Sequence, residues 1–179
     1  MPVLSAAERE RLLMLDDQAL VASCEVDLYK ASGTGGQKRN KTSSAVRMRH
    51  KPSGVIAKAA DSRSQSDNRR KALLRLRENL ALDLRVPISP SYQVSKAASD
   101  ALKQGPYGKN SKTRIRPAYL VALAEILDVF ASEKAVLARA ARRLGVSSGA
   151  LAKLLCGDDR VVRRMHELRS QHNLKPLRA

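Results

Sequence analysis

Aromatic residues and long apolar runs are both scarce in this chain of 179 residues. Tryptophan is absent and aromatic residues amount to 3%, which disfavours a surface that binds single strands by stacking bases on aromatic rings. No apolar run approaches the roughly 20 residues of a membrane span. The N-terminus, with Glu8, Glu10 and Asp16, lacks the features of a secretory signal or a transit peptide. We therefore expect a cytoplasmic protein with no membrane partner.

Cysteine and histidine are too few and too widely spaced to indicate a metal or redox site. Cys24 and Cys156 lie far apart, and His50, His166 and His172 match no metal-ligand spacing. No Ser/His/Asp or Cys/His arrangement is indicated either, which disfavours covalent catalysis. We expect two buried, unpaired thiols, no metal and no cofactor.

Acidic residues are half as common as basic ones. The chain has 17 Asp and Glu against 34 Lys and Arg, a formal charge of +17. Such an excess favours a polyanionic partner, nucleic acid first and an acidic membrane second. The excess is largest in residues 25–85, where 15 basic residues stand against six acidic ones.

Alternation of apolar and polar residues with period two predicts three strands in the first half of the chain. One strand covers residues 25–31, a second covers residues 46–49 and a third covers residues 55–59. Residues 51–54, Lys-Pro-Ser-Gly, predict a type I turn between the last two. The outward side of this hairpin carries the basic side chains Arg47, Arg49 and Lys58.

Two helices complete the first predicted domain. Ser5 and Glu8 have the spacing of a capping box, which predicts a short first helix. A longer helix opens at residue 64, and its apolar stripe can cover a small sheet while Lys71, Arg75 and Glu78 face outward. The stripe consists of Leu73, Leu76, Leu80 and Leu84. We therefore predict an α+β fold for residues 1–85, a small sheet packed by one long helix.

The rest of the chain predicts a linker and an all-α domain. Prolines and glycines punctuate residues 86–117, a basic linker with at most one helical piece around residues 93–103. Residues 118–179 predict a bundle of three or four helices. One helix is closed by Gly145, the next is capped by Ser147 or Ser148, and the last is capped by Asp158.

Residues 32–41, Ser-Gly-Thr-Gly-Gly-Gln-Lys-Arg-Asn-Lys, carry the strongest chemical signal. Gly35 and Gly36 allow backbone conformations that residues with a Cβ resist. Gln37 is neutral and cannot serve as a strong acid, base or nucleophile. If this segment is catalytic, we expect it to act by placing peptide dipoles, not by titrating.

This segment and its neighbours carry a family resemblance. Residues 31–47, the Pro-Ser-Gly-Val of residues 52–55, the Arg-Ser-Gln of residues 63–65 and Asn68 occur in one order. Together they resemble the catalytic domain of class I peptide chain release factors, and they are similar also to the related rescue hydrolases that act without a stop codon. The likeness covers about residues 25–80.

The resemblance implies hydrolysis of the ester that links a nascent peptide to transfer RNA, inside the peptidyl transferase centre. The implied partners are large-subunit ribosomal RNA and peptidyl-tRNA, and we expect a monomer. In the family, the backbone N–H of the glutamine, here Gln37, stabilises developing charge, which by analogy with oxyanion-hole donors contributes roughly 3–4 kcal/mol. Gly35 and Gly36 would allow the turn that presents this N–H.

Two further groups of residues receive roles from this interpretation. The first group would contact RNA phosphates and seat the domain without reading sequence. It comprises Lys38, Arg39, Asn40, Lys41, Arg47 and Arg49. The second group would cap the long helix and tie it to the glycine loop. It comprises Arg63, Ser64, Gln65 and Asn68.

The subtype and two alternatives complete the interpretation. Complete release factors carry a codon-reading domain before the catalytic one, and only about 24 residues precede the first strand here. Ser89-Pro90-Ser91 also has the wrong place and form for a recognition tripeptide, so we expect action on stalled ribosomes without a stop codon. One alternative is a non-catalytic RNA-binding or ribosome-associated protein. The other is a DNA-binding regulator using residues 140–155, which have the pattern of a helix-turn-helix. In the expected recognition helix, only Lys153 is a long polar side chain that could contact bases.

Overall fold

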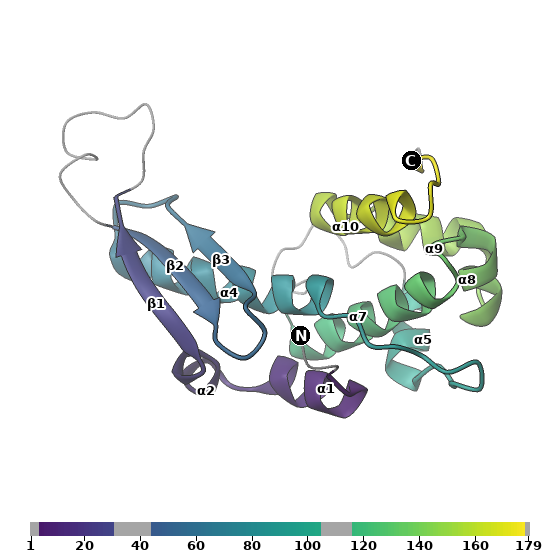
Figure 1. The fold of residues 1–179 in the computed structure, drawn as a ribbon, viewed down its shortest axis with the longest axis horizontal. Coiled ribbons are helices and arrows are strands. Elements are labelled where there is room, and N and C mark those ends of the chain that lie inside the picture. The colour runs from purple at the N-terminus through teal and green to yellow at the C-terminus, as the bar shows by residue number, and fades with distance from the viewer. Residues whose placement is uncertain (1–3, 31–43, 105–115, 178–179) are drawn as a thin grey trace. The chain divides into compact units, whose positions relative to one another are not determined.

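A computed structural model describes residues 4–30, 44–104 and 116–177. Within these residues the chain forms a three-stranded antiparallel sheet and eight helices, which confirms the predicted α+β class (Figure 1). The chain divides into a sheet unit, Arg11–Leu80, and a helical unit, Pro2–Glu10 with Ala81–Ala179. The predicted division into domains of residues 1–85 and 118–179, joined by a linker, stays a prediction.

The sheet consists of β1 (Cys24–Tyr29), β2 (Ala45–His50) and β3 (Ile56–Ala59), in that order. Alternation along β2 is as predicted, because Val46 and Met48 are buried while Arg47 and Arg49 are exposed. In β3, too, every second residue is buried. The sheet therefore has one apolar face and one charged face.

The turn between β2 and β3 is present but is one residue wider than a type I turn. Gly54 N donates to the His50 carbonyl oxygen at 2.8 Å, and His50 N donates to the Val55 carbonyl oxygen at 2.9 Å. Gly54 has a φ of 71°, a region where glycine is favoured. Inside the turn His50 Nδ1 lies 2.7 Å from Ser53 Oγ, and both residues are buried. His50 therefore has a structural role in the turn, and burial lowers the pKa of its imidazole ring.

The capping box predicts the first helix correctly. In α1 (Ala6–Met14), Ser5 N donates to Glu8 Oε2 at 2.8 Å and Glu8 N donates to Ser5 Oγ at 3.2 Å. A short helix that the sequence analysis missed, α2 (Asp17–Ala22), follows at once. Its N-terminal cap is Asp16, whose Oδ1 accepts from Ala19 N at 2.7 Å.

The long helix α4 (Gln65–Asp83) lies across the sheet in Figure 1. Leu76 and Leu80 of its predicted stripe are completely buried. Two side chains tie it to the backbone of β3: Arg75 Nη1 donates to the Lys58 carbonyl oxygen and Asn79 Nδ2 to that of Ile56, each at 2.8 Å. Glu78 contradicts the sequence analysis, since it was expected to face outward and is only 6% exposed.

The helical unit contains α5 (Lys96–Gln104), α7 (Pro117–Ser132), α8 (Leu137–Arg143), α9 (Ser148–Leu155) and α10 (Asp159–Ser170). The apolar helix α7 forms its centre, with nearly every side chain from Tyr119 to Phe130 buried. The predicted helix ends are confirmed. Gly145 has a φ of 69°, Ser147 Oγ accepts from Ala150 N at 3.1 Å, and Asp158 Oδ1 accepts from Arg160 N at 2.9 Å.

A charged cluster lies inside the helical unit, and no sequence pattern predicted it. Asp128 of α7 is 2% exposed and forms ion pairs with Arg9 and with Arg85, the latter at 3.0 Å from Nη1 to Oδ1. Val86 N also donates to Asp128 Oδ1 at 3.1 Å. Burial lowers the pKa of Arg85 to about 10. Burial also raises the pKa of Asp128, although Arg85 and Arg9 oppose that shift.

The two cysteines differ from each other. Cys24 is buried as expected, its Sγ lies 3.1 Å from the Leu20 carbonyl oxygen, and burial raises the pKa of its thiol. Cys156 is only half-buried, contrary to expectation. Within the described ranges, no group of three or more His, Cys, Asp or Glu side chains could hold a metal ion. None of the described helices is long and apolar enough to cross a membrane.

Candidate functional site

The centre of the predicted site lies outside the described residues. This applies to the three predicted catalytic residues and to four of the predicted RNA contacts. They are Gly35, Gly36, Gln37, Lys38, Arg39, Asn40 and Lys41. The structure does describe the base from which this segment departs, because Tyr29 at the end of β1 pairs with Ala45 at the start of β2.

Asn68 fixes the chain where it re-enters the sheet. The side chain is completely buried, and its Nδ2 donates to the carbonyl oxygens of Ser44 at 2.7 Å and Ser62 at 2.8 Å. Its Oδ1 accepts from Ser62 N at 2.9 Å. One amide thus links the residue before β2 to the turn that precedes α4. This geometry suits the loop-supporting role predicted for Asn68, which stays a prediction.

The other predicted loop-supporting residues lie at the start of α4. Ser64 caps the helix, since its Oγ accepts from Asp67 N at 3.2 Å and its N–H donates to Ser62 Oγ at 3.1 Å. Arg63 and Gln65 are exposed at the same helix end. The structure therefore brings Ser64 and Asn68 together around Ser62 and leaves the long side chains of Arg63 and Gln65 at the surface.

Arg47 and Arg49, the two predicted RNA contacts that the structure describes, have acidic partners on the neighbouring strand. Arg47 Nη2 lies 2.7 Å from Asp27 Oδ2, and Arg49 Nη1 lies 3.6 Å from Glu25 Oε2. Both pairs follow from the register of β1 and β2, which sets these residues opposite each other. The alternation of β1 already placed Glu25 and Asp27 on one face, so this pairing was available to sequence reasoning.

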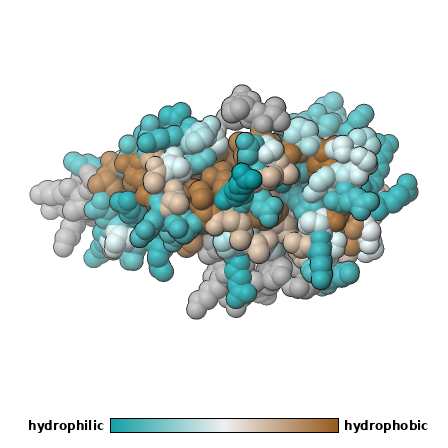
Figure 2. Space-filling model, turned by 90° about the horizontal axis from the view of Figure 1, so that it is seen from below, coloured by the Kyte–Doolittle hydropathy of each residue, from teal (hydrophilic) through white to brown (hydrophobic). Residues whose placement is uncertain are grey.

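Apolar side chains interrupt the hydrophilic surface of the sheet unit. Figure 2 shows one face of the molecule, on which hydrophobic residues appear among the hydrophilic ones. The most exposed large apolar side chains of the described residues are Met14, Leu28 and Ile56, all in the sheet unit. Ile56 stands opposite Arg49 in the sheet, so the charged face is not uniformly polar.

The predicted helix-turn-helix segment has the expected order of elements. Helix α8 ends at Arg143, and α9 begins at Ser148 after a connection closed by Gly145. Ser148, Gly149 and Lys153 are exposed on α9. Specific base contacts usually require Arg, Asn or Gln. Because α9 exposes none of these, it lacks the side chains for sequence-specific contacts in a major groove.

Comparison with known proteins adds a family match. The family profile described as RF-1 domain matches residues 19–121, more than half of the chain. Peptide chain release factor 1 of Leptospira biflexa is 38% identical over 92 residues, which cover 51% of this chain and 24% of that protein. The protein of the same name from Lacticaseibacillus casei is 54% identical over 54 residues, 30% of this chain and 15% of its own length. The chain thus spans about a quarter or less of these curated relatives.

Proposed function

The chain belongs to the RF-1 domain family, that of the class I peptide chain release factors, and on this premise we propose that it hydrolyses the peptidyl-tRNA ester on the ribosome without reading a stop codon. The observation that carries the proposal is the match over residues 19–121, since it includes the Gly-Gly-Gln segment and the strands beside it. The reaction would be hydrolysis by water within a site made largely of RNA.

The proposed mechanism assigns one task to each part of the segment. Gln37 would direct its backbone N–H at the charge that develops as the ester breaks, and Gly35 and Gly36 would allow the chain to present it. The paired ends of β1 and β2 supply a fixed base for the segment. The buried amide of Asn68 supports that base from α4 through its bond to Ser44.

Positioning on ribosomal RNA is the proposed task of the basic residues. Lys38, Arg39, Asn40 and Lys41 would contact phosphates beside the catalytic residues. Arg47 and Arg49 are about half exposed and can exchange Asp27 and Glu25 for phosphate oxygens, because exposed ion pairs contribute little stability. We propose that the protein works in the cytoplasm as a monomer.

The codon-independent part of the proposal is supported by the engagement of Ser89-Pro90-Ser91. The Ser89 carbonyl oxygen accepts a hydrogen bond from Arg143 Nη2, and the hydroxyls of Ser89 and Ser91 lie 3.2 Å apart. The backbone of this tripeptide is thus bonded to α8, and we propose that it does not read a codon.

The test is a peptide-release assay on ribosomes that hold peptidyl-tRNA beside an empty A site. One set of complexes carries a message that ends in the P site, a second carries a stop codon in the A site, and a third carries a sense codon there. We expect release from the first set and no preference for the stop codon over the sense codon. Preferential release at the stop codon would contradict the codon-independent mechanism.

A pair of glycine variants tests the catalytic assignment. Gly36→Ala is expected to slow release by about 10²–10³-fold, the loss seen when one charge-stabilising donor is misplaced. Gly149→Ala is the matched control, because a Cβ there meets only Ser147 Oγ at 3.9 Å. Equal release by the two variants would disprove catalysis by this segment. Ribosome binding without any release by the natural chain would favour the non-catalytic alternative.

A further inference from the structure

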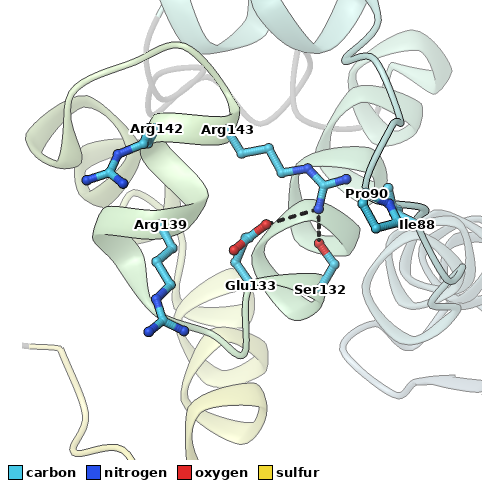
Figure 3. A pocket seen from close by; sticks show the side chains of 7 residues that line it. All are labelled: Ile88, Pro90, Ser132, Glu133, Arg139, Arg142 and Arg143. Carbon is cyan, nitrogen blue, oxygen red and sulfur yellow. Dashed lines mark hydrogen bonds and ion pairs between the residues drawn. The ribbon is translucent and has the colours of Figure 1, made fainter.

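The helical unit contains an open groove of about 560 Å³ beside α8. Pro90 lies on one side of the groove and Glu133, at the end of α7, forms part of its wall. The remaining charged lining comes from one helix, since Arg139, Arg142 and Arg143 all belong to α8 (Figure 3). The groove is therefore predominantly cationic.

Arg143 builds the wall of this groove. Its Nη1 donates to Ser132 Oγ at 3.1 Å and to Glu133 Oε1 at 3.0 Å, and its Nη2 donates to the Ser89 carbonyl oxygen. These bonds join α8 to the end of α7 and to the chain segment before α5. The one carboxylate of the lining is thereby engaged with Arg143 and does not neutralise the other two arginines.

Arg139 and Arg142 have no such role. Both are exposed, and neither guanidinium group has a hydrogen-bond or ion-pair partner in the part of the chain that the structure describes. Figure 3 shows both side chains extending away from the pair formed by Arg143 and Glu133. The helix dipole favours cations in the last turn, which accounts for Arg142 and Arg143. It does not account for Arg139, which lies one turn earlier and repels both of the others at spacings of three and four residues.

We propose that this groove binds the phosphate backbone of RNA, as a docking site separate from the Gly-Gly-Gln segment. Guanidinium groups match phosphate oxygens with two parallel hydrogen bonds, and two of them are unpartnered here. The lining contains no aromatic residue, so bases are not stacked and recognition is independent of sequence. This inference extends the proposed function. Only the ribosomal setting of the groove rests on that function, because binding of free RNA requires no hydrolysis.

The test measures binding of the full chain to labelled RNA by fluorescence anisotropy between about 50 and 200 mM salt. The probes are two single-stranded RNAs of equal length and unrelated sequence. The variant R139Q/R142Q is expected to reduce the slope of log K against log salt by about 1.4, since each phosphate contact on a single strand contributes about 0.7. Both RNA sequences should give the same reduction.

Two matched variants separate a defined site from bulk charge. R163Q/K175Q removes the same charge from exposed residues that do not line the groove, and it should leave the slope close to that of the natural chain. R139K/R142K keeps the charge and should recover most of the slope. Equal losses in R139Q/R142Q and R163Q/K175Q, or no loss in either, would overturn the proposal.

Two further probes test the occupant. Duplex DNA and anionic phospholipid vesicles are measured with the same set of variants. Binding to either that is tighter than binding to RNA, and that R139Q/R142Q abolishes, would show that RNA is the wrong occupant. Docking is measured from the salt slope on free RNA and catalysis from release on ribosomes, so failure of the docking proposal and failure of the proposed function remain distinguishable.

Discussion

Two ion pairs, one from each unit of this protein, differ sharply in burial. In the sheet unit Arg47 and Asp27 pair on the outer face of the sheet, each about 48% exposed. In the helical unit Arg85 and Asp128 pair inside the fold, at 17% and 2% exposure. Exposed pairs contribute about 0–1 kcal/mol, whereas removal of one partner from a buried pair costs about 3–5 kcal/mol. A count of charges along the sequence therefore cannot tell which charges hold the fold and which remain free to bind.

The largest expected effect comes from the buried cluster of the helical unit. Asp128→Ala leaves Arg9 and Arg85 without their shared carboxylate and the N–H of Val86 without its acceptor. We expect the free energy of unfolding to fall by about 3–5 kcal/mol. Urea denaturation measures this loss, and hydrogen exchange should locate it in the amides of α7.

The matched control is Asp27→Ala, which removes the same side chain from an exposed pair. We expect this change to lower the free energy of unfolding by less than about 1 kcal/mol. If Asp27→Ala and Asp128→Ala were equally destabilising, the contrast between the two ion pairs would be wrong.

The next effect tests whether a buried polar group in the sheet unit behaves like the cluster in the helical unit. Asn68→Ala removes three hydrogen bonds and deprives the carbonyl oxygens of Ser44 and Ser62 of this donor. We expect a loss of about 2–3 kcal/mol by denaturation. Because Ser44 adjoins the proposed catalytic segment, peptide release should also slow at temperatures where the variant stays folded.

Asn79→Ala is the control within the same helix. Asn79 Nδ2 makes a hydrogen bond of the same kind to the Ile56 carbonyl oxygen at 2.8 Å, but Asn79 is not buried. We expect a loss of about 0.5–1.5 kcal/mol and an unchanged release rate. A release rate that falls equally in both variants would contradict a specific support of the loop base by Asn68.

The sequence predicted well those features that depend on residues close together along the chain. The capping box of Ser5 and Glu8, the cap of Ser147 and the helix end at Gly145 each involve partners within four residues. The alternation of β2 was equally local. Such features follow from local backbone geometry and from side chains a few residues away, and the structure confirms them.

The features that the sequence could not supply depend on residues brought together by folding. The cluster around Asp128 joins residues 9 and 85 to α7, and no periodicity connects these positions. Glu78 was misplaced because helical spacing alone does not show which neighbours cover a helix. The candidate catalytic segment, by contrast, was predicted from its Gly-Gly-Gln motif. The groove beside α8 could not be predicted from the sequence, because it forms only when folding brings Pro90 near Arg139.

The smallest expected effect concerns pH, and it differs in sign between the units. Burial lowers the pKa of His50 in the sheet unit, so the folded state favours the neutral ring. Its contribution to stability is present above the ordinary pKa of about 6.5 and is lost as the pH falls through the folded value. In the helical unit, burial and the nearby Glu125 carboxylate raise the pKa of Tyr92 to about 12. Its contribution is complete below about pH 10 and is lost as the pH rises toward 12.

The two units should therefore loosen at opposite ends of the pH range. Hydrogen exchange of the β2 amides, used to monitor denaturation, should show a loss of stability in mild acid. This loss should be smaller in His50→Gln, because the glutamine side chain cannot gain a proton. Exchange in α7 should show a loss in strong alkali that is smaller in Tyr92→Phe, because the phenyl ring keeps the packing and cannot ionise. Each substitution should leave the other unit's pH dependence unchanged. An alkaline loss that persists fully in Tyr92→Phe would show that another group of the helical unit titrates there, and the contrast in pH response would then no longer rest on Tyr92.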